Sequence, residues 1–286
     1  DYVVDSFNQD KPYDFFVKEQ IAGDLLQESG NPAQQKMRVI ATGFLSLGPK
    51  VLAEVDAKKM EMDIIDEQIN TLGQAFLGLT LGCARCHDHK FDPVSMDDYY
   101  GLVGIFQSTR TMEHFSKVAR WYENSIASEK QNQQKKIHDR QGVEIKESIE
   151  KVIGEERIRL SLKSQTEDME NQDAESMFSE TVRVKLATLR ERLKHQESNL
   201  PEQPTALGVA EGTISDSHMY VRGNHLEPGP SVPRHLPVNL SYSGQNEFSS
   251  TDSGRMQLAE WLVDHDHPLT SRVMVNRIWR WHFGRG

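Results

Sequence analysis

The segment that organises the first part of this chain reads Cys83-Ala84-Arg85-Cys86-His87. Cys83 and Cys86 are the only cysteines among the 286 residues, and they lie three positions apart. A disulfide between residues this close would enclose too short a loop to constrain much of the unfolded chain. We therefore expect this pair to carry chemistry rather than to stabilise the fold.

The spacing of Cys83, Cys86 and His87 suits covalent attachment of a c-type haem. Two thiols three residues apart on one helical turn can each add to a vinyl group of the porphyrin, and the adjacent imidazole then faces the iron. The sequence thus predicts haem c bound through Cys83 and Cys86, with His87 as an axial ligand of the iron. Apolar residues on both sides of the motif predict a dry wall around the haem: Phe76, Leu77, Leu79, Leu81, Tyr99, Tyr100, Leu102 and Phe106.

Two other uses of this motif stay open. Zinc is the first, because Cys83, Cys86, His87 and His89 are all zinc ligands by type, although the adjacent Cys86 and His87 would strain one tetrahedral centre. A redox-active dithiol is the second, but it would need a thiol of lowered pKa and usually a βαβ setting, which the surrounding sequence lacks. A metal site or a purely structural role is the main alternative to haem.

The second axial ligand of such an iron is not identified by the sequence. His89 lies too close to His87 to reach the opposite face of the porphyrin, so we interpret it as a group that supports the loop, with Asp88 or Asp92. None of the remaining candidates is preferred, because residues of these types usually pack in cores or lie at surfaces. These candidates are Met37, Met60, Met62 and His114.

The first hundred residues predict short amphipathic helices, and we assign residues 1–110 to a small helical bundle around the motif. Apolar residues recur at i, i+3, i+4 and i+7 from Met37 onward, and a further apolar face runs from about Met60 to Leu77. Ser95 and Asp98 predict a capping box for the helix that follows the motif.

Residues 111–200 are rich in Lys, Glu, Gln and Arg and contain almost no Gly or Pro. Apolar residues at four- and three-residue spacing predict two long antiparallel helices that share a narrow seam, with a break near residues 165–173. The seam residues are Ile145, Ile149, Val152, Val182, Leu186, Leu189 and Leu193. We interpret the charge runs as solvated helix faces, and the hairpin is a candidate surface for a protein partner.

The last part of the chain divides in two. Residues 201–250 are rich in Pro, Gly, Ser and Asn, which predicts a loop-rich connecting segment with little β-structure beyond one short strand at 218–222. Residues 251–286 return to helical spacing, and we assign them to the beginning of a second, helical domain. The predicted fold class is therefore mainly α.

Composition argues against two classes of protein. The formal net charge of −10 argues against binding of nucleic acid, because nucleic-acid-binding proteins present a basic face. No run approaches the roughly 18 consecutive apolar residues that a membrane span needs. The chain starts at Asp1 with neither an initiator Met nor a signal peptide, so we expect an internal fragment of a longer protein.

Several short motifs resemble a known family, the planctomycete cytochrome-c-like domain. The segments that carry this resemblance are Lys11-Pro12-Tyr13-Asp14, Glu19 to Asp24, Ala41-Thr42-Gly43-Phe44, Asp66 to Ile69, Phe76 to Pro93 and Asp98-Tyr99-Tyr100. Val221 to Asn224, Pro228-Gly229 and Val232-Pro233-Arg234 are similar to its usual continuation. A further set of segments resembles the opening of a partner domain that is usually fused to this family. These segments are Ser253-Gly254-Arg255, Leu258 to Leu262, Pro268-Leu269-Thr270, Val273 to Trp279 and His282 to Gly286.

The resemblance covers both ends of the chain, skips its helical middle, and implies a large exported multidomain protein. Covalent haem likewise implies a location in the periplasm or at the cell surface. Our leading expectation is an electron-transfer module with an unidentified redox partner protein, rather than an enzyme. One alternative is a structural or binding protein whose motif holds zinc or no metal. Another is part of an exported enzyme acting on polymers, which rests on the resemblance alone.

Overall fold

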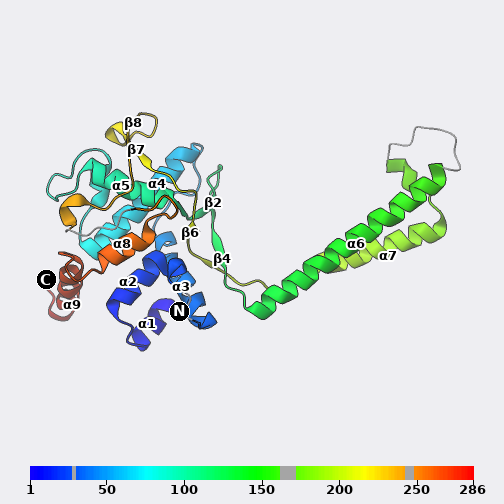
Figure 1. Cartoon of the computed structure of the whole chain (residues 1–286), viewed down its shortest axis with the longest axis horizontal. Coiled ribbons are helices and arrows are strands. Elements are labelled where there is room, and N and C mark those ends of the chain that lie inside the picture. The colour runs from blue at the N-terminus through cyan, green and yellow to red at the C-terminus, as the bar shows by residue number, and fades with distance from the viewer. Residues whose placement is uncertain (28–29, 162–171, 242–247) are drawn as a thin grey trace. The chain divides into compact units, whose positions relative to one another are not determined.

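The computed structural model describes residues 1–27, 30–161, 172–241 and 248–286. The chain forms two compact units, one made of residues 1–126 and 205–286 and one made of residues 127–204. The described residues are mainly helical with little sheet, which confirms the predicted fold class (Figure 1). None of the helices in these ranges combines the length and the apolar character that crossing a membrane requires.

Short helices build most of the first unit. Its α-helices are α1 (Tyr2–Asn8), α2 (Tyr13–Ala22), α3 (Pro32–Ala41), α4 (Ala57–Leu72), α5 (Met96–Gln107), α8 (Arg255–Leu262) and α9 (Thr270–Phe283). Its 3-10 turns are η1 (Gly23–Leu25), η2 (Thr42–Ser46), η4 (Leu81–Arg85), η6 (Val221–Gly223) and η7 (Val238–Leu240), and the π-helical turn η3 (Gly73–Leu77) extends α4.

The start of α5 follows the predicted capping box. Ser95 Oγ accepts from the Asp98 backbone N–H at 3.1 Å, and Asp98 Oδ2 accepts from the Ser95 backbone N–H at 2.9 Å. Each side chain thus satisfies a backbone donor that the first turn of a helix leaves without a partner. The prediction from the Ser95–Asp98 spacing is confirmed.

The described strands are short, and they form two-stranded antiparallel sheets. The pairs are β1 (Thr109–Arg110) with β6 (Ala210–Glu211), β2 (Met112–His114) with β3 (Arg120–Trp121), β4 (Glu123–Ser125) with β5 (Thr205–Leu207), and β7 (Ser217–Tyr220) with β8 (Pro228–Val232). The β1–β6 and β4–β5 pairs return the chain to the first unit after residues 127–204. The strand predicted at 218–222 is present as β7, with η6 in place of its last residues.

One apolar cluster forms the main core of the first unit. It contains buried side chains of α2, α4, α5 and α8, including Val17, Ile21, Met62, Ile69, Leu72, Tyr99, Tyr100, Ile105, Leu258 and Leu262. Fully burying an aliphatic or aromatic side chain of this size stabilises the fold by about 1.5–3 kcal/mol. The core therefore joins a helix from residues 254–286 to helices from the first hundred residues.

The second unit is the predicted antiparallel hairpin, made of α6 (Glu129–Ser161) and α7 (Glu180–Ser198) (Figure 1). Val152, Phe178 and Leu186 are buried in its seam. His138 Nε2 donates to the Gln196 carbonyl oxygen at 2.8 Å, and Gln196 Nε2 donates to the His138 carbonyl oxygen at 2.7 Å. Residues 165–171 of the predicted break lie outside the described residues.

Candidate functional site

The Cys83–His87 motif lies on a tight turn that follows the end of α4. Gly78 ends the π-helical turn η3 in a left-handed conformation, with φ of 67°. The chain then enters η4, a 3-10 helix with about three residues per turn, so residues three positions apart share a face. The motif therefore has three faces with different surroundings.

The first face anchors the motif in the core through Leu81 and Ala84, which are 1% and 0% exposed. The hydroxyl of Tyr100 donates to the Arg85 carbonyl oxygen at 3.0 Å and lies 3.4 Å from the Tyr220 carbonyl oxygen. Burial raises the pKa of Tyr100 to about 12, so the hydroxyl keeps the proton that it donates. The backbone of the motif is thus fixed to the core by both apolar and polar contacts.

The second face carries Arg85, which contacts two carboxylates of α4. Arg85 Nη1 lies 3.0 Å from Asp63 Oδ1 and 3.7 Å from Asp66 Oδ2. Asp66 Oδ1 also accepts from the Tyr99 hydroxyl at 2.6 Å. Burial raises the pKa of Asp66, while the Tyr99 hydrogen bond and the Arg85 charge oppose that shift. These contacts fix the side chain of a residue that lies between the two cysteines.

The third face carries both thiols, which are free and exposed. The Cys83 thiol donates to Thr80 Oγ1 across 3.8 Å. Cys86 lies against the η6 turn, because a Cβ atom added to Gly223 would lie only 2.7 Å from the Cys86 Sγ. Both thiols can therefore react with a group that approaches from solvent.

His87 is also exposed, and one hydrogen bond fixes the position of its ring proton. Its Nδ1 lies 2.7 Å from the Asp88 carbonyl oxygen. A carbonyl oxygen can only accept, so Nδ1 carries the proton in this contact. In the neutral ring, Nε2 is then unprotonated and its lone pair is available to a metal.

His89 has a different role, since both of its ring nitrogens are engaged. Its Nδ1 accepts from the backbone N–H groups of Phe91 at 3.2 Å and Asp92 at 2.8 Å. The proton must therefore lie on Nε2, which is 3.1 Å from Thr80 Oγ1 and 3.4 Å from an Asp92 carboxylate oxygen. His89 thus organises the loop after the motif, as its proximity to His87 led us to expect.

The four residues considered for zinc are not assembled as one ligand set. Among the described residues, no group of three or more His, Cys, Asp or Glu side chains lies close enough together to hold a metal ion. Cys83, Cys86 and His87 are exposed and close in the sequence, whereas the His89 ring is turned to Thr80 and its own loop. The motif thus offers two accessible thiols and one accessible imidazole, but not a preformed metal site.

The structure corrects the predicted apolar wall. Its residues pack inside the main core, where Phe76, Leu77 and Phe106 are at most 5% exposed, so they do not line the surface on which the thiols lie. Two of the candidates for the second axial ligand, Met60 and Met62, are likewise buried in apolar clusters and do not reach that surface. The other two candidates are not buried: Met37 is half-buried and His114 is exposed.

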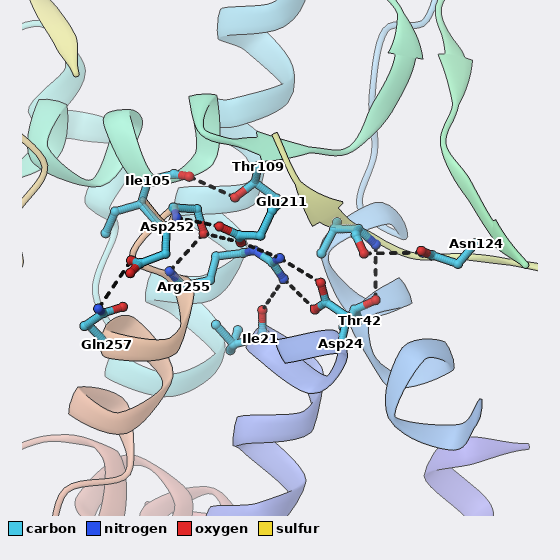
Figure 2. Close-up of polar contacts among 12 residues, drawn as sticks. Ile21, Asp24, Thr42, Ile105, Thr109, Asn124, Glu211, Asp252, Arg255 and Gln257 are labelled. Atoms are coloured by element: carbon cyan, nitrogen blue, oxygen red, sulfur yellow. Dashed lines mark hydrogen bonds and ion pairs between the residues drawn. The ribbon is translucent and has the colours of Figure 1, made fainter. Parts of the chain in front are cut away.

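A second polar cluster, which no motif in the sequence predicts, surrounds Arg255 in the core (Figure 2). Arg255 is fully buried at the start of α8, and its guanidinium donates to both carboxylate oxygens of Asp24 at 2.7 and 2.8 Å. It also donates to Glu211 Oε1 at 2.9 Å and to the Ile21 carbonyl oxygen at 3.2 Å. Arginine is rarely buried, so residue type alone predicts the wrong environment here.

Two family models match parts of the chain. Residues 1–111 match PSCyt2, a protein of unknown function (DUF1549), and residues 254–286 match PSD1, a protein of unknown function (DUF1553). These two domains are a known pairing in planctomycete-type proteins, which agrees with the resemblance at both ends of the sequence. The matches carry no support for a cytochrome c. Neither the curated proteins nor the solved structures include a match to this chain.

Proposed function

We propose that this chain is an electron-transfer module in which one haem is attached through Cys83 and Cys86, with His87 as an axial ligand. When bound, the haem would supply a one-electron couple between ferric and ferrous iron. In this proposal the residues of the chain hold and orient the group, and the protein carries electrons rather than transforming a substrate.

The observation that carries the proposal is the tautomer of His87. Its Nδ1 proton is donated to the Asp88 carbonyl oxygen at 2.7 Å, which leaves Nε2 free and exposed. Metal-binding histidines usually donate their second ring N–H to a carbonyl or carboxylate in this way, because the hydrogen bond fixes the ring and raises the basicity of the ligating nitrogen.

The two thiols support the same interpretation. Each thiol would add its sulfur and its hydrogen across one vinyl group, so both must be free, reachable and on one face of the turn. Cys83 and Cys86 are free and exposed; Cys83 lies within η4, and Cys86 is the residue that caps its end, three positions later. Leu81 and Ala84 hold the opposite side of the turn in the core, so attachment would not require the core to open.

The exposure of the motif changes what is expected of the redox centre. The predicted dry wall is part of the core, so the surroundings of Cys83 and His87 are open to solvent. Exposure to water stabilises the more highly charged ferric state, and we therefore expect a lower reduction potential than a buried site would give. A partner protein would reach the site directly from solvent.

The proposal extends to location and partner. Covalent haem attachment takes place after export, so we place the protein in the periplasm or at the cell surface. The hairpin of α6 and α7 presents long charged faces, which we propose as a surface for a protein partner.

The test is a pyridine haemochrome spectrum after export together with haem-ligation machinery. We expect a c-type band that resists acid-acetone extraction, is absent from the Cys83→Ala, Cys86→Ala variant, and is altered in His87→Ala. The matched control is His265→Ala, which removes a histidine whose side chain is 99% exposed and should leave the band unchanged. A colourless but folded wild-type protein would refute the proposal.

The same preparation distinguishes the alternative cofactor. Elemental analysis of a colourless, folded protein would report zinc if Cys83, Cys86 and His87 hold that metal with a further ligand. Zinc that is lost in the double cysteine variant would establish a metal site in place of haem. A protein free of both iron and zinc would leave the motif with a structural role.

A further inference from the structure

An apolar groove of about 350 Å³ lies between α9 on one side and α1 with the start of α2 on the other. Phe7 and Phe16 line one wall, and Met274, Val275 and Ile278 line the opposite wall. The two walls thus come from distant parts of the sequence. Exposed apolar surface that is gathered in one place, rather than scattered, marks a site at which another molecule is bound.

Apolar side chains continue beyond the groove on both helices. On α1, Val3 and Phe7 are exposed and lie one helical turn apart, with 70% of Phe7 exposed. Trp281 is 74% exposed and follows Met274 and Ile278 at seven- and three-residue spacing, so it extends the α9 wall of the groove. The exposed apolar residues of α9 are Val275, Ile278, Trp279, Trp281 and Phe283.

The two walls belong to segments of opposite charge. Residues 270–286 contain four arginines and no Asp or Glu, whereas residues 1–14 contain four aspartates and one lysine. That lysine, Lys11, already pairs with Glu19. One wall of the groove is therefore bordered by cations and the other by carboxylates.

The charges beside the groove are not paired with each other. Asp10 and Asp14 are exposed on the acidic side, and Arg272 and Arg280 are exposed on the basic side. Within the described part of the chain, none of these four side chains takes part in an ion pair. Both charged borders are thus available to a second molecule.

We infer that this surface binds a second copy of the chain, in a symmetric dimer in which α1 and the start of α2 of each copy pack on α9 of its partner. A two-fold axis makes this contact twice. In both contacts an apolar wall meets an apolar wall and an acidic border meets a basic one, because a single surface carries both complementary halves. The dimer is independent of the cysteine motif and of the function proposed for it.

The exposed aromatic rings supply much of the area that such a dimer needs. An aromatic side chain buries about 150–250 Å² when it is fully covered, so four that are more than half exposed offer roughly 300–500 Å² per copy. A stable interface buries about 800 Å² per partner, and the aliphatic side chains and the groove itself add to the aromatic share. The rings are those of Phe7, Trp279, Trp281 and Phe283.

The net charge of the chain does not prevent this association. The formal charge of −10 repels a second copy, but exposed charges more than about 8 Å apart are largely screened at physiological ionic strength. The charges that meet at the interface therefore decide the electrostatic contribution, and there the two copies are complementary.

Sedimentation velocity of the full chain, from low to high micromolar concentration, tests the inference. We expect a dimer whose dissociation constant rises about tenfold or more in Phe7→Ala and in Trp281→Ala, the effect of truncating a central interface residue. The matched control is Phe91→Ala, because Phe91 is 84% exposed on the loop after the cysteine motif and should not affect the dimer. Far-UV circular dichroism checks that each variant is folded.

A charge exchange tests the contact between the two borders directly. Asp10→Asn, Asp14→Lys removes the acidic border, and asparagine suits the left-handed backbone of Asp10, whose φ is 52°. Arg272→Glu, Arg280→Glu replaces cations of the α9 border by carboxylates. Each double variant alone should be largely monomeric, because its two borders no longer carry opposite charge. An equimolar mixture should recover the dimer, since the basic border of the first variant then meets the acidic border of the second.

Three results would overturn the inference. The first is a wild-type chain that stays monomeric at every concentration, including one that instead binds vesicles containing phosphatidylglycerol, which would assign the surface to lipid. The second is a dimer that Phe7→Ala and Trp281→Ala both leave unchanged. The third is a mixture of the two charge variants that associates no better than either variant alone.

Discussion

Gly223 lies directly against Cys86, so that a Cβ atom on Gly223 would be 2.7 Å from the Cys86 Sγ. Gly223 has φ of +74°, a left-handed conformation that glycine adopts without the steric cost of a side chain. The preceding Arg222 is also left-handed, with φ of 50°. The backbone N–H of Val221 donates to the Glu227 carbonyl oxygen at 3.0 Å, which ties the turn to the start of β8. A turn far along the sequence thus sets the space available to one thiol of the motif.

Gly223→Ala is expected to destabilise the first unit and to lower haem attachment. The left-handed backbone alone costs roughly 1–2 kcal/mol for a residue with a Cβ atom, and the new methyl group would also displace the Cys86 sulfur. The melting temperature, the haemochrome yield and the rate of thiol alkylation measure these effects. Gly284→Ala is the control, because Gly284 has φ of +80° with open space around it. Equal losses of haem in both variants would contradict the role assigned to the contact.

Arg255→Met is expected to destabilise the first unit strongly. The substitution leaves Asp24 and Glu211 as carboxylates without their cation in a largely buried cluster, and breaking a buried ion pair from one side typically costs about 3–5 kcal/mol. Urea unfolding, followed by a probe in the first unit, measures the change. The control is Arg272→Met on the exposed side of α9, which should change stability by no more than about 0.5 kcal/mol. A loss as small as that of the control would show that the cluster is not important for stability.

His267 is expected to make the stability of the first unit depend on pH. Burial lowers the pKa of His267 to about 4, against the opposing effect of Asp264. In the unfolded chain the pKa is about 6.5, so between these values the unfolded state binds more protons than the folded state. The contribution of His267 to the free energy of unfolding is therefore fully present above pH 6.5, and the free energy of unfolding falls by about 2–3 kcal/mol as the pH is lowered to 4.

His267→Asn separates this titration from the hydrogen bonds of the same residue. The Nδ1 of His267 accepts from the Leu269 and Thr270 backbone N–H groups at 3.2 and 3.3 Å at the start of α9, and an asparagine oxygen can also accept there. Thermal unfolding between pH 4 and 7 should lose most of its slope in this variant. His265→Asn, at a side chain that is 99% exposed, should keep the slope of the wild type. An unchanged slope in His267→Asn would show that another group causes it.

Local signals in the sequence were enough for much of the secondary structure. The Ser95–Asp98 capping box, the periodic apolar face that ends at Leu77 and the seam around Leu186 all depend on residues a few positions apart. Such spacing directly expresses the geometry of a helix, which is why these predictions could be made without the fold. The candidate site residues Cys83, Cys86 and His87 were likewise proposed from type and spacing alone.

Predictions about which side a residue faces were less successful. The apolar side chains of Phe76 and Leu77 would suit either the wall of a cofactor site or a protein core. The structure shows that they belong to the core. The sequence also gave no reason to bury Arg255, because its partners Asp24 and Glu211 come from distant parts of the chain. Long-range contacts of this kind depend on how the elements pack.

Residue types at short spacing are enough to predict the helical class, the hairpin, and the thiol and imidazole groups of the Cys83–His87 motif. Only the folded chain shows that the thiols are exposed, that His87 offers Nε2 while His89 supports the loop, and that Gly223 lies against Cys86. These properties come from contacts between segments and from the direction of individual hydrogen bonds. Residue spacing does not specify these contacts and hydrogen bonds, because they form only when distant segments pack together.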